Sequence, residues 1–432
     1  MIQLIKSLGQ PLRLDKKQII LALLTIAIAI ALMIFPALTQ QRVTVTILMR
    51  GLEAAQWKPF IAEFEQKNPY IHLEIIEAPN ATNQVEDLYT SSFLLGNSPY
   101  DLVYMDIIWV PKFAAAGWLL ALDNRLSPQE LAEFLPGDID GGTYQERLYR
   151  MPFLTNAGML YYRQDLLEEG GYQPPETFEE LVRISRNLQE EGKVEWGYIW
   201  QGKQYEGLSA MFVEILQGFG AFWLDPDTGE VGLDRPAAID GVRFLRSTLE
   251  KGISPPGITT YAEEETRRLF QNGKAVFLRN WPYVFALASQ DDSSIQGKFA
   301  IKPMVHAPGY GSGACLGGWG LGISSSSKHP DEAWKIIQFM TGEDIQRRYV
   351  LQTGTAPTRR NLYREPAIVG KYPYYPQLLK VVESSALRPP ITQYAQASDI
   401  LQRYLSAALT NRMSAKQAME AAAKETRFLL QK

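Results

Sequence analysis

The sequence predicts an α/β protein with two domains that follow an N-terminal apolar segment. From about residue 41 onward, strand and helix patterns alternate, which is typical of helices packed on the faces of sheets. This part of the chain has almost 400 residues, too many for one ordinary core, so two domains are expected. Apolar residues make up 46% of the chain, enough to fill two cores.

The N-terminal segment predicts where the protein works. Arg13, Lys16 and Lys17 precede a charge-free apolar run over residues 19–38. The run has about the ~20 residues that a bilayer span needs, more than the ~7–15 of a typical signal-peptide core. It ends in a poor cleavage site, and no cysteine follows it for lipid attachment. We therefore assign residues 1–40 to a cytoplasmic basic flank with a signal or anchor helix, an uncleaved anchor being favoured, and expect the rest outside the membrane.

The first elements form a strand–helix–strand unit. Apolar residues alternate with other residues over 43–47 and again over 71–75, which predicts two strands. Between them, apolar residues from Trp57 to Phe64 follow helical spacing, and Pro69 ends that helix. Such a unit predicts a parallel pair with a right-handed crossover. A further apolar run, Leu102 to Met105, predicts a buried strand.

The later elements continue the same alternation. Thr177, after two prolines, is a predicted N-cap for a helix that reaches about Glu191. The Ser414 capping box predicts a terminal helix that runs almost to Lys432. Other helices are expected over 238–250, 263–271 and 331–340, and a short strand over 275–278.

Composition and residue usage exclude several classes of partner. The 43 basic and 47 acidic residues form no long single-sign run, which argues against nucleic acid and anionic membrane surfaces. Cys315 is the single cysteine, so no disulfide can form within the chain, and we expect it to be a small buried residue. The three histidines, His72, His306 and His329, are isolated and predict no metal site. No cofactor is expected.

Enzyme signatures are missing from the sequence. It contains no GxSxG, no Walker A motif and no GxGxxG that opens a helix after a strand. These absences argue against the enzyme classes that the motifs mark. An extracytoplasmic glycoside hydrolase acting on small glucosides is an alternative that they do not address. Such an enzyme needs only two carboxylates ~5–9.5 Å apart, and the 47 acids leave that possibility open.

Two acids follow predicted strands at the edge where open α/β sheets bind ligands. Glu53 comes after the first strand and Asp106 directly after the strand over 102–105. Acids in these positions also stabilise the first turn of a helix. From position alone, helix capping and ligand contact explain each residue equally well.

Aromatic residues make up 11% of the chain, and several stand beside glycine, proline or polar residues. A flat aromatic face can cover the C–H face of a sugar ring, while acids, arginine and asparagine satisfy its hydroxyls. Core packing is the more common role of a single aromatic residue. Trp281 and Trp319 differ, because the proline or glycine beside them predicts exposed loops.

From about Thr46 to its end, the chain resembles the extracellular solute-binding proteins of ABC sugar importers (family 1, trehalose/maltose-binding type). Six segments occur in the family's order over the whole body. They are Trp57 to Pro69 (WKPFIAEFEQKNP), Tyr104 to Leu120 (YMDIIWVPKFAAAGWLL), Ala157 to Leu181 (AGMLYYRQDLLEEGGYQPPETFEEL), Trp196 to Leu208 (WGYIWQGKQYEGL), Phe270 to Tyr283 (FQNGKAVFLRNWPY) and Leu316 to Ile323 (LGGWGLGI).

The resemblance implies a type II periplasmic-binding-protein fold. In this fold, two α/β lobes close about a hinge over a ligand held in the cleft between them. We assign residues 41–151 and 284–345 to lobe I, and residues 152–283 and 346–432 to lobe II. The resemblance also implies a monomer outside the membrane, tethered by its N-terminal helix, that delivers ligand to two permease subunits with cytoplasmic ATPases. Together with the missing enzyme signatures, the resemblance favours a binding protein, and not an enzyme, over the glycoside hydrolase. A sensor that presents bound sugar to a membrane partner is a further possibility.

The resemblance also implies which residues contact the ligand. The chain has matching positions for four kinds of ligand contact in the family. They are acids that bind sugar hydroxyls, stacking aromatics, a glycine loop that lets the ligand approach the backbone, and an arginine that donates to sugar oxygens. These residues are Glu53 and Asp106, Trp281 and Trp319, Gly317 and Gly318, and Arg388.

Other positions depart from the family pattern. An aspartate is replaced by Asn156, a tyrosine by Leu154, and an arginine is absent where Gln84 or Val85 stands. A site built for one hydroxyl pattern rejects another, because buried polar groups are then left unpaired. We therefore expect Asn156 to contact the ligand, and the ligand to keep one glucosyl ring but carry a smaller or more polar second half. Glucosylglycerol fits this description, within a class that includes trehalose, sucrose and maltose.

Overall fold

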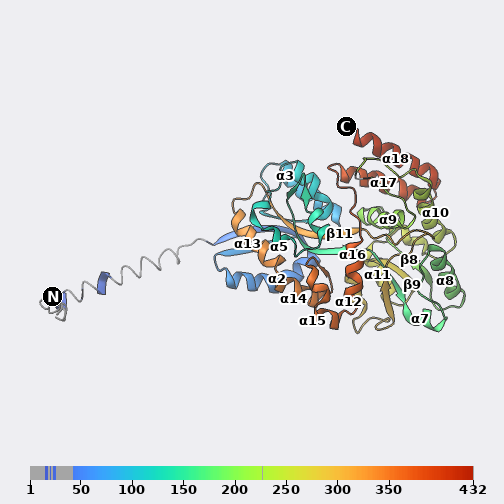
Figure 1. Cartoon of the computed structure of the whole chain (residues 1–432), viewed down its shortest axis with the longest axis horizontal. Helices are drawn as coiled ribbons and strands as arrows, with labels where there is room; N and C mark the ends of the chain where they lie inside the picture. Colours follow the sequence, from blue (N-terminus) through green and yellow to red (C-terminus); the bar gives the residue numbers. More distant parts are fainter. Residues whose placement is uncertain (1–14, 18–19, 21–22, 26–41, 226, 432) are drawn as a thin grey trace, which may run out of the picture.

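The protein contains two large β-sheets with helices on their faces (Figure 1). The computed structural model describes residues 15–17, 20, 23–25, 42–225 and 227–431. The first sheet has six strands in the order β12-β6-β11-β3-β1-β2, and the second has four in the order β10-β7-β9-β8. This arrangement confirms the predicted α/β class.

The first sheet is mixed. Its strands are β1 (Val43–Arg50), β2 (Ile71–Ala78), β3 (Leu102–Asp106), β6 (Met151–Ala157), β11 (Leu316–Ile323) and β12 (Ala356–Pro357). Strand β1 is parallel to both β2 and β3, as the strand–helix–strand pattern predicts. Strand β11 lies antiparallel between β3 and β6. The second sheet consists of β7 (Met159–Arg163), β8 (Trp196–Ile199), β9 (Ala275–Asn280) and β10 (Phe299–Lys302).

Each sheet has its own helices. The first packs against α2 (Gly51–Lys67), α3 (Thr82–Leu94), α6 (Pro136–Asp140), α13 (Pro330–Thr341), α14 (Glu343–Thr353) and α16 (Tyr375–Glu383). The second packs against α7 (Gln164–Glu169), α8 (Phe178–Glu190) and α11 (Glu263–Gln271). A helical layer of α9 (Glu206–Gly218), α10 (Pro236–Glu250), α17 (Tyr394–Leu409) and α18 (Ala415–Leu430) adjoins the second sheet. In Figure 1, α2, α3 and α13 lie on the left side of the folded body and α8, α10 and α18 on its right side.

Shorter helices complete the chain. They are α4 (Val110–Ala115), α5 (Pro128–Leu131), α12 (Tyr283–Ala288) and α15 (Pro366–Lys371), with the two-stranded ribbon β4 (Thr143–Tyr144) and β5 (Arg147–Leu148). Both predicted N-caps are confirmed, because the Thr177 and Ser414 side chains accept from the backbone N–H three residues on in complete capping boxes.

The chain passes between the sheets three times. Strand β6 leads through Gly158 directly into β7, and the chain crosses again between β10 and β11 and between α16 and α17. A Cβ at Gly158 would clash with the carboxylate of Glu214, so a glycine is needed at this crossing. An isolated β-bridge pairs Cys315 with Ala386, which joins the second and third crossings. Two sheets linked by three crossing segments form the predicted two-lobed architecture.

Sheet membership departs from the expected division of the chain in three places. Strand β6, of which all but the first residue was expected in lobe II, belongs to the first sheet. Strand β10, expected in lobe I, pairs with β7 of the second sheet. Strand β12 and helix α16, expected in lobe II, pack on β6 of the first sheet. Local patterns predict strands but not their distant partners, which explains the difference. We propose residues 42–157 and 316–383 for one lobe and 158–315 and 384–431 for the other.

Most of the apolar run over residues 19–38 lies outside the described residues, and so does the expected cleavage region. Within the part of the chain that the structure describes, no helix has both the length and the apolar character that a bilayer crossing requires.

Candidate functional site

The carboxyl ends of β1 and β3 bring the two predicted acids to one edge of the first sheet. Asp106 is the last residue of β3, and Glu53 lies in the first turn of α2, directly after β1. Asp106 does cap the following turn, since its side chain accepts from the backbone N–H of Ile108 at 3.3 Å. Glu53 makes an ion pair with Arg50, and its Oε2 atom is buried without a hydrogen-bond partner among the described residues.

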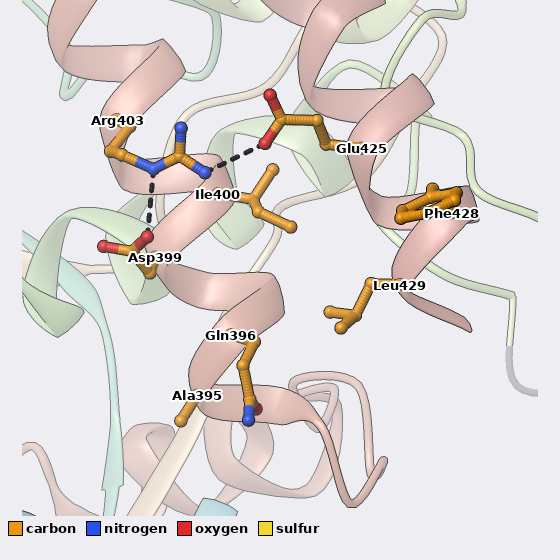
Figure 2. A pocket seen from close by; sticks show the side chains of 8 residues that line it. All are labelled: Ala395, Gln396, Asp399, Ile400, Arg403, Glu425, Phe428 and Leu429. Atoms are coloured by element: carbon orange, nitrogen blue, oxygen red, sulfur yellow. Dashed lines mark hydrogen bonds and ion pairs between the residues drawn. The ribbon is translucent and has the colours of Figure 1, made fainter. Parts of the chain in front are cut away.

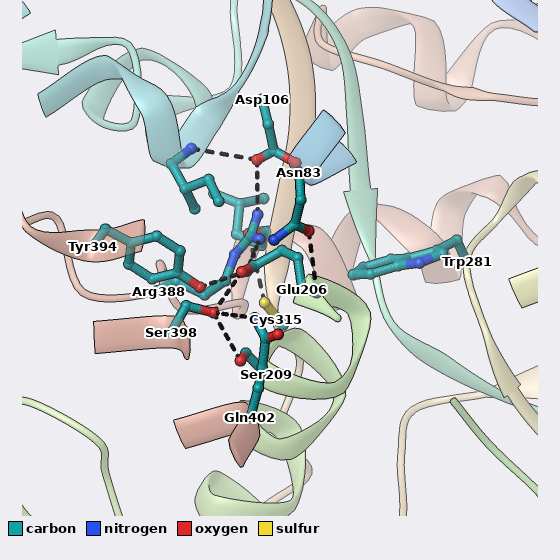
Figure 3. Close-up of polar contacts among 12 residues, drawn as sticks. Asn83, Asp106, Glu206, Ser209, Trp281, Cys315, Arg388, Tyr394, Ser398 and Gln402 are labelled. Carbon is teal, nitrogen blue, oxygen red and sulfur yellow. Dashed lines mark hydrogen bonds and ion pairs between the residues drawn. The ribbon is translucent and has the colours of Figure 1, made fainter. Parts of the chain in front are cut away.

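Arg388 connects Asp106 to an acid of the second lobe (Figure 3). Its Nη2 donates to Asp106 Oδ1 at 2.9 Å, and its Nη1 donates to Glu206 Oε1 at 2.7 Å. The Arg388 side chain is only 3% exposed. Such charge-assisted contacts in a dry environment fix the guanidinium in one orientation.

Glu206, at the start of α9, gathers several donors. Tyr394 donates to its Oε1, and Ser398 donates to its Oε2 at 2.6 Å. Burial raises the pKa of Glu206, and the neighbouring Arg388 opposes that rise. The backbone N–H of Glu206 also approaches the Asn83 side-chain oxygen at 3.4 Å, and Asn83 belongs to α3 beside the first sheet. Glu206 therefore contacts a helix beside the first sheet, a crossing segment and helix α17.

Trp281 forms a second cluster with Asn156 and Gly317. The guanidinium of Arg279 lies 4.1 Å from the centre of the Trp281 ring, and the indole N–H donates to Glu263 at 3.4 Å. A Cβ added at Gly317 would lie 3.5 Å from the Cβ of Asn156 and 3.6 Å from the Trp281 ring. The ring is half-buried, and Figure 3 shows it directed toward the Arg388 contacts.

The ion pair beneath Trp281 is fully buried. Arg279 donates from Nε to Glu214 Oε2 at 2.7 Å and from Nη1 to Gln201 at 3.0 Å. Burial raises the pKa of Glu214, while Arg279 opposes the rise. Because β9 carries Arg279 and α9 carries Glu214, the pair ties α9 to the second sheet.

Trp319, Gly317 and Gly318 do not lie in an exposed loop, so that prediction is wrong. All three belong to β11 in the middle of the first sheet, and Trp319 is only 4% exposed. Its ring stacks on Tyr104 with centroids 5.0 Å apart, meets Trp109 edge-on at 5.3 Å, and lies under the guanidinium of Arg50 at 4.0 Å.

The glycines of β11 are needed for close packing and not for a loop. A Cβ at Gly318 would lie 2.7 Å from the backbone oxygen of Leu154, and one at Gly320 would lie 2.6 Å from Arg150 Nε. A glycine-rich segment can therefore be a central strand where neighbouring backbone and side chains approach closely.

Strand β11 brings the predicted residues together. Gly317 pairs with Asn156, and Trp319 pairs with Leu154 on one side and Asp106 on the other. The clusters around Trp281 and Trp319 are thus both built against strand β11, the first at Gly317 and the second at Trp319 itself. Three charged residues escaped the prediction from sequence, namely Arg50, Glu206 and Arg279. The Arg50–Glu53 spacing of three residues was the one local signal available.

A surface hollow in the described part of the chain lies away from these residues (Figure 2). It has a volume of about 670 Å³ and opens between α17 and α18, where Arg403 makes ion pairs with Asp399 and Glu425. Its lining residues are Ala395, Gln396, Asp399, Ile400, Arg403, Glu425, Phe428 and Leu429. None of the predicted site residues lines this hollow.

Two lobes are joined by three crossings, and acids, arginines and an aromatic ring lie where the lobes meet. This combination defines a two-lobed solute-binding protein. Residues 51–347 match the family described as bacterial extracellular solute-binding protein, and the chain belongs to this family. The match confirms the resemblance to binding proteins of ABC sugar importers, and it places the protein outside the cytoplasm.

Three relatives illustrate the family. A maltose-bound MalE3 of T. maritima superposes with a TM-score of 0.85 at 38% identity, covering 89% of this chain and 99% of that one. A probable ABC transporter-binding protein of Deinococcus radiodurans is 29% identical over 348 residues, which cover 79% of this chain and 82% of the relative. A mannitol-binding protein of Pseudomonas aeruginosa is 24% identical and covers 92% and 96%. The names of these relatives describe binding proteins and not enzymes.

Proposed function

We propose that this protein captures a small neutral sugar or glucoside outside the membrane and delivers it to an ABC permease. The observation that carries the proposal is the charge balance around the first-sheet edge. Two arginines, Arg50 and Arg388, are paired with three acids, Glu53, Asp106 and Glu206. An anionic ligand would meet no excess positive charge there, whereas hydroxyl groups can both donate to the acids and accept from the arginines.

The predicted residues then take distinct roles. Trp281 covers one face of a glucosyl ring, with Asn156 and the backbone of Gly317 at the ring's edge. Glu53, Asp106 and Arg388 hydrogen-bond hydroxyls where the lobes meet. Gly318 and Trp319 shape the wall behind the ligand. Closure of the lobes excludes water and strengthens these hydrogen bonds.

For the ligand itself, we propose a glucosyl-containing disaccharide or glucoside osmolyte of the glucosylglycerol, trehalose, sucrose or maltose class. A relative bound to maltose and another named for mannitol support a site that accepts hydroxyl-rich molecules of different shapes. Asn156 in place of an aspartate favours a changed hydroxyl pattern, because an amide donates as well as accepts. We favour glucosylglycerol within this class.

We further propose the surroundings of the protein. It acts as a monomer, tethered to the membrane by its N-terminal helix, and docks in its closed form on two permease subunits whose ATPases lie in the cytoplasm. The charge-free run over residues 19–38 supports the tether.

Calorimetric titration of the full chain with glucosylglycerol, trehalose, sucrose and maltose tests this proposal. We expect saturable binding with micromolar or tighter affinity, strongest for glucosylglycerol. Equal or tighter binding of maltose or trehalose would refute the choice of ligand, and binding of no sugar would refute the ligand class. After the titration, the sugar recovered from the calorimeter cell is analysed by NMR. Its hydrolysis would favour a glycoside hydrolase instead.

A further inference from the structure

The Trp319 ring has little surface left for a sugar. Tyr104 stacks on it with an interplanar angle of 26°, Trp109 contacts it edge-on, and the Arg50 guanidinium lies over it. A pyranose needs an open aromatic face to stack, and the 4% of Trp319 that remains exposed is too little. A ligand entering from the cleft therefore meets Arg50 before it meets this ring.

Arg50 is held over the ring by its place in the fold. It is the last residue of β1 and directly precedes α2, so its side chain lies at the carboxyl edge of the first sheet. Glu53, three residues on, makes an ion pair with it across the first turn of the helix. The ion pair on one side and the Trp319 ring on the other restrict the guanidinium to one place.

The Arg50–Glu53 pair keeps hydrogen-bonding capacity that the described residues do not use. Arg50 Nε and Glu53 Oε2 are both buried, and neither has a partner in the described part of the chain. The hydroxyl of Tyr104, stacked on the same Trp319 ring, is buried and unpartnered as well. Buried polar atoms without partners are costly, so three of them in one place indicate that another molecule pairs with them. The Arg50 side chain is 20% exposed, which leaves its guanidinium within reach.

We infer that Arg50 is a ligand-binding residue and that it determines which chemical groups the first-sheet half of the cleft accepts. This half binds hydroxyls through Arg50 and Glu53 and does not stack a second sugar ring on Trp319. The inference rests on the proposed function, since it concerns the second half of the same ligand. An open-chain polyol fits such a subsite, because each of its hydroxyls can turn to meet a fixed donor or acceptor.

Maltose and maltitol make a sharp pair of probes. Both carry the same glucosyl unit, which we expect to stack on Trp281 in either case. The second half is a ring in maltose and an open chain in maltitol. We expect the full-length protein to bind maltitol more tightly than maltose by calorimetric titration. In Arg50→Met, maltitol should bind about 10- to 100-fold more weakly, because charge-assisted hydrogen bonds are lost. Maltose should lose less than threefold, or gain, because the Trp319 ring is uncovered.

Arg348→Met is the matched control. Arg348 also lies over an aromatic ring, 5.5 Å from the centre of Phe60, and also pairs with a glutamate, Glu63, but it lies on α14 away from the site. This variant should leave both affinities within twofold. Thermal unfolding checks that each variant is folded. If Arg50→Met lacks a cooperative transition, Arg50→Lys carries the test, with an expected three- to tenfold loss for maltitol and unchanged maltose.

Two failures are distinguishable. If the unmodified protein binds neither probe nor glucosylglycerol, the proposed function falls and the inference falls with it. If the unmodified protein binds a probe and Arg50→Met leaves both affinities unchanged, or lowers them equally, the inference alone is overturned. A preference of the unmodified protein for maltose over maltitol also overturns it.

Discussion

Replacing Glu206 by glutamine tests whether ligand affinity depends on Glu206, which orients Arg388 by accepting a hydrogen bond from its guanidinium. Glutamine keeps the shape of the side chain but removes its charge and one of its two accepting atoms. In the native protein Glu206 receives three donors, from Arg388 at 2.7 Å, from Ser398 at 2.6 Å and from Tyr394. The amide nitrogen cannot accept, so one of these donors loses its partner.

The expected magnitude follows from these contacts. Turning a charge-assisted hydrogen bond into a neutral one costs about 1–2 kcal/mol, and a buried donor left unpaired costs about 1–3 kcal/mol. We expect Glu206→Gln to lower the free energy of unfolding by about 2–4 kcal/mol. Arg388 then keeps its ion pair with Asp106 but loses the one with Glu206, so its guanidinium is oriented less firmly. We therefore expect sugar affinity to fall by about 5- to 30-fold.

Calorimetry of the sugar that binds the unmodified protein measures the affinity, and thermal unfolding measures the stability. Ser209→Ala is the matched control, since Ser209 lies on the same helix and contacts Ser398 at 2.9 Å but not Arg388. It should lower stability slightly and leave affinity unchanged. The reasoning is refuted if Glu206→Gln keeps full affinity, or if both variants lose affinity in proportion to their lost stability.

Three further predictions concern Trp281, Asp138 and Gly158. Trp281→Ala should weaken sugar binding by about 1–3 kcal/mol from lost aromatic burial, and unchanged affinity in a titration would remove Trp281 from the site. Burial raises the pKa of Asp138 to about 7, although Arg150 lowers it, so the folded protein holds a proton that the unfolded chain releases near pH 4. Stability should therefore fall as pH rises from about 4 to 7, and Asp138→Asn should gain on the order of 2–4 kcal/mol at pH 8 but little at pH 4; parallel pH curves of the melting temperature would contradict this. Gly158→Ala should lower the melting temperature by several degrees, because its Cβ meets the buried Glu214 carboxylate, while Gly370→Ala, in open space, should not.

Local patterns were enough to predict the elements that build the site's framework. The alternation over 43–47 and 71–75 reflects strands with one face more buried than the other, and the capping boxes at Thr177 and Ser414 are complete signals within four residues. The strand-end positions of Glu53 and Asp106 follow from the same patterns, since parallel strands end at one edge. In each case the physical cause lies within a few residues of the element it determines.

The remaining site residues depend on contacts that no local pattern encodes. Trp319 was expected in a loop, because glycines weaken every strand signal; they are required by Leu154 and Arg150, which come more than 150 residues earlier. Glu206 looks like any acid at the start of a helix, and its partner Arg388 is 182 residues away. Such pairs become visible only when the sheet order and the crossings are known.

The position of Arg388 links ligand affinity to the arrangement of the lobes. It lies in the third crossing, between α16 and α17, close to the bridge between Cys315 and Ala386. Its guanidinium holds Asp106 of the first sheet with one nitrogen and Glu206 of α9 with the other. Helix α9 is in turn fixed to the second sheet through the buried pair of Glu214 and Arg279. Moving the lobes apart would therefore stretch the ion pairs that Arg388 makes with Asp106 and Glu206. Arg388, which we propose donates to sugar oxygens, thus also stabilises the closed arrangement of the lobes that encloses the sugar.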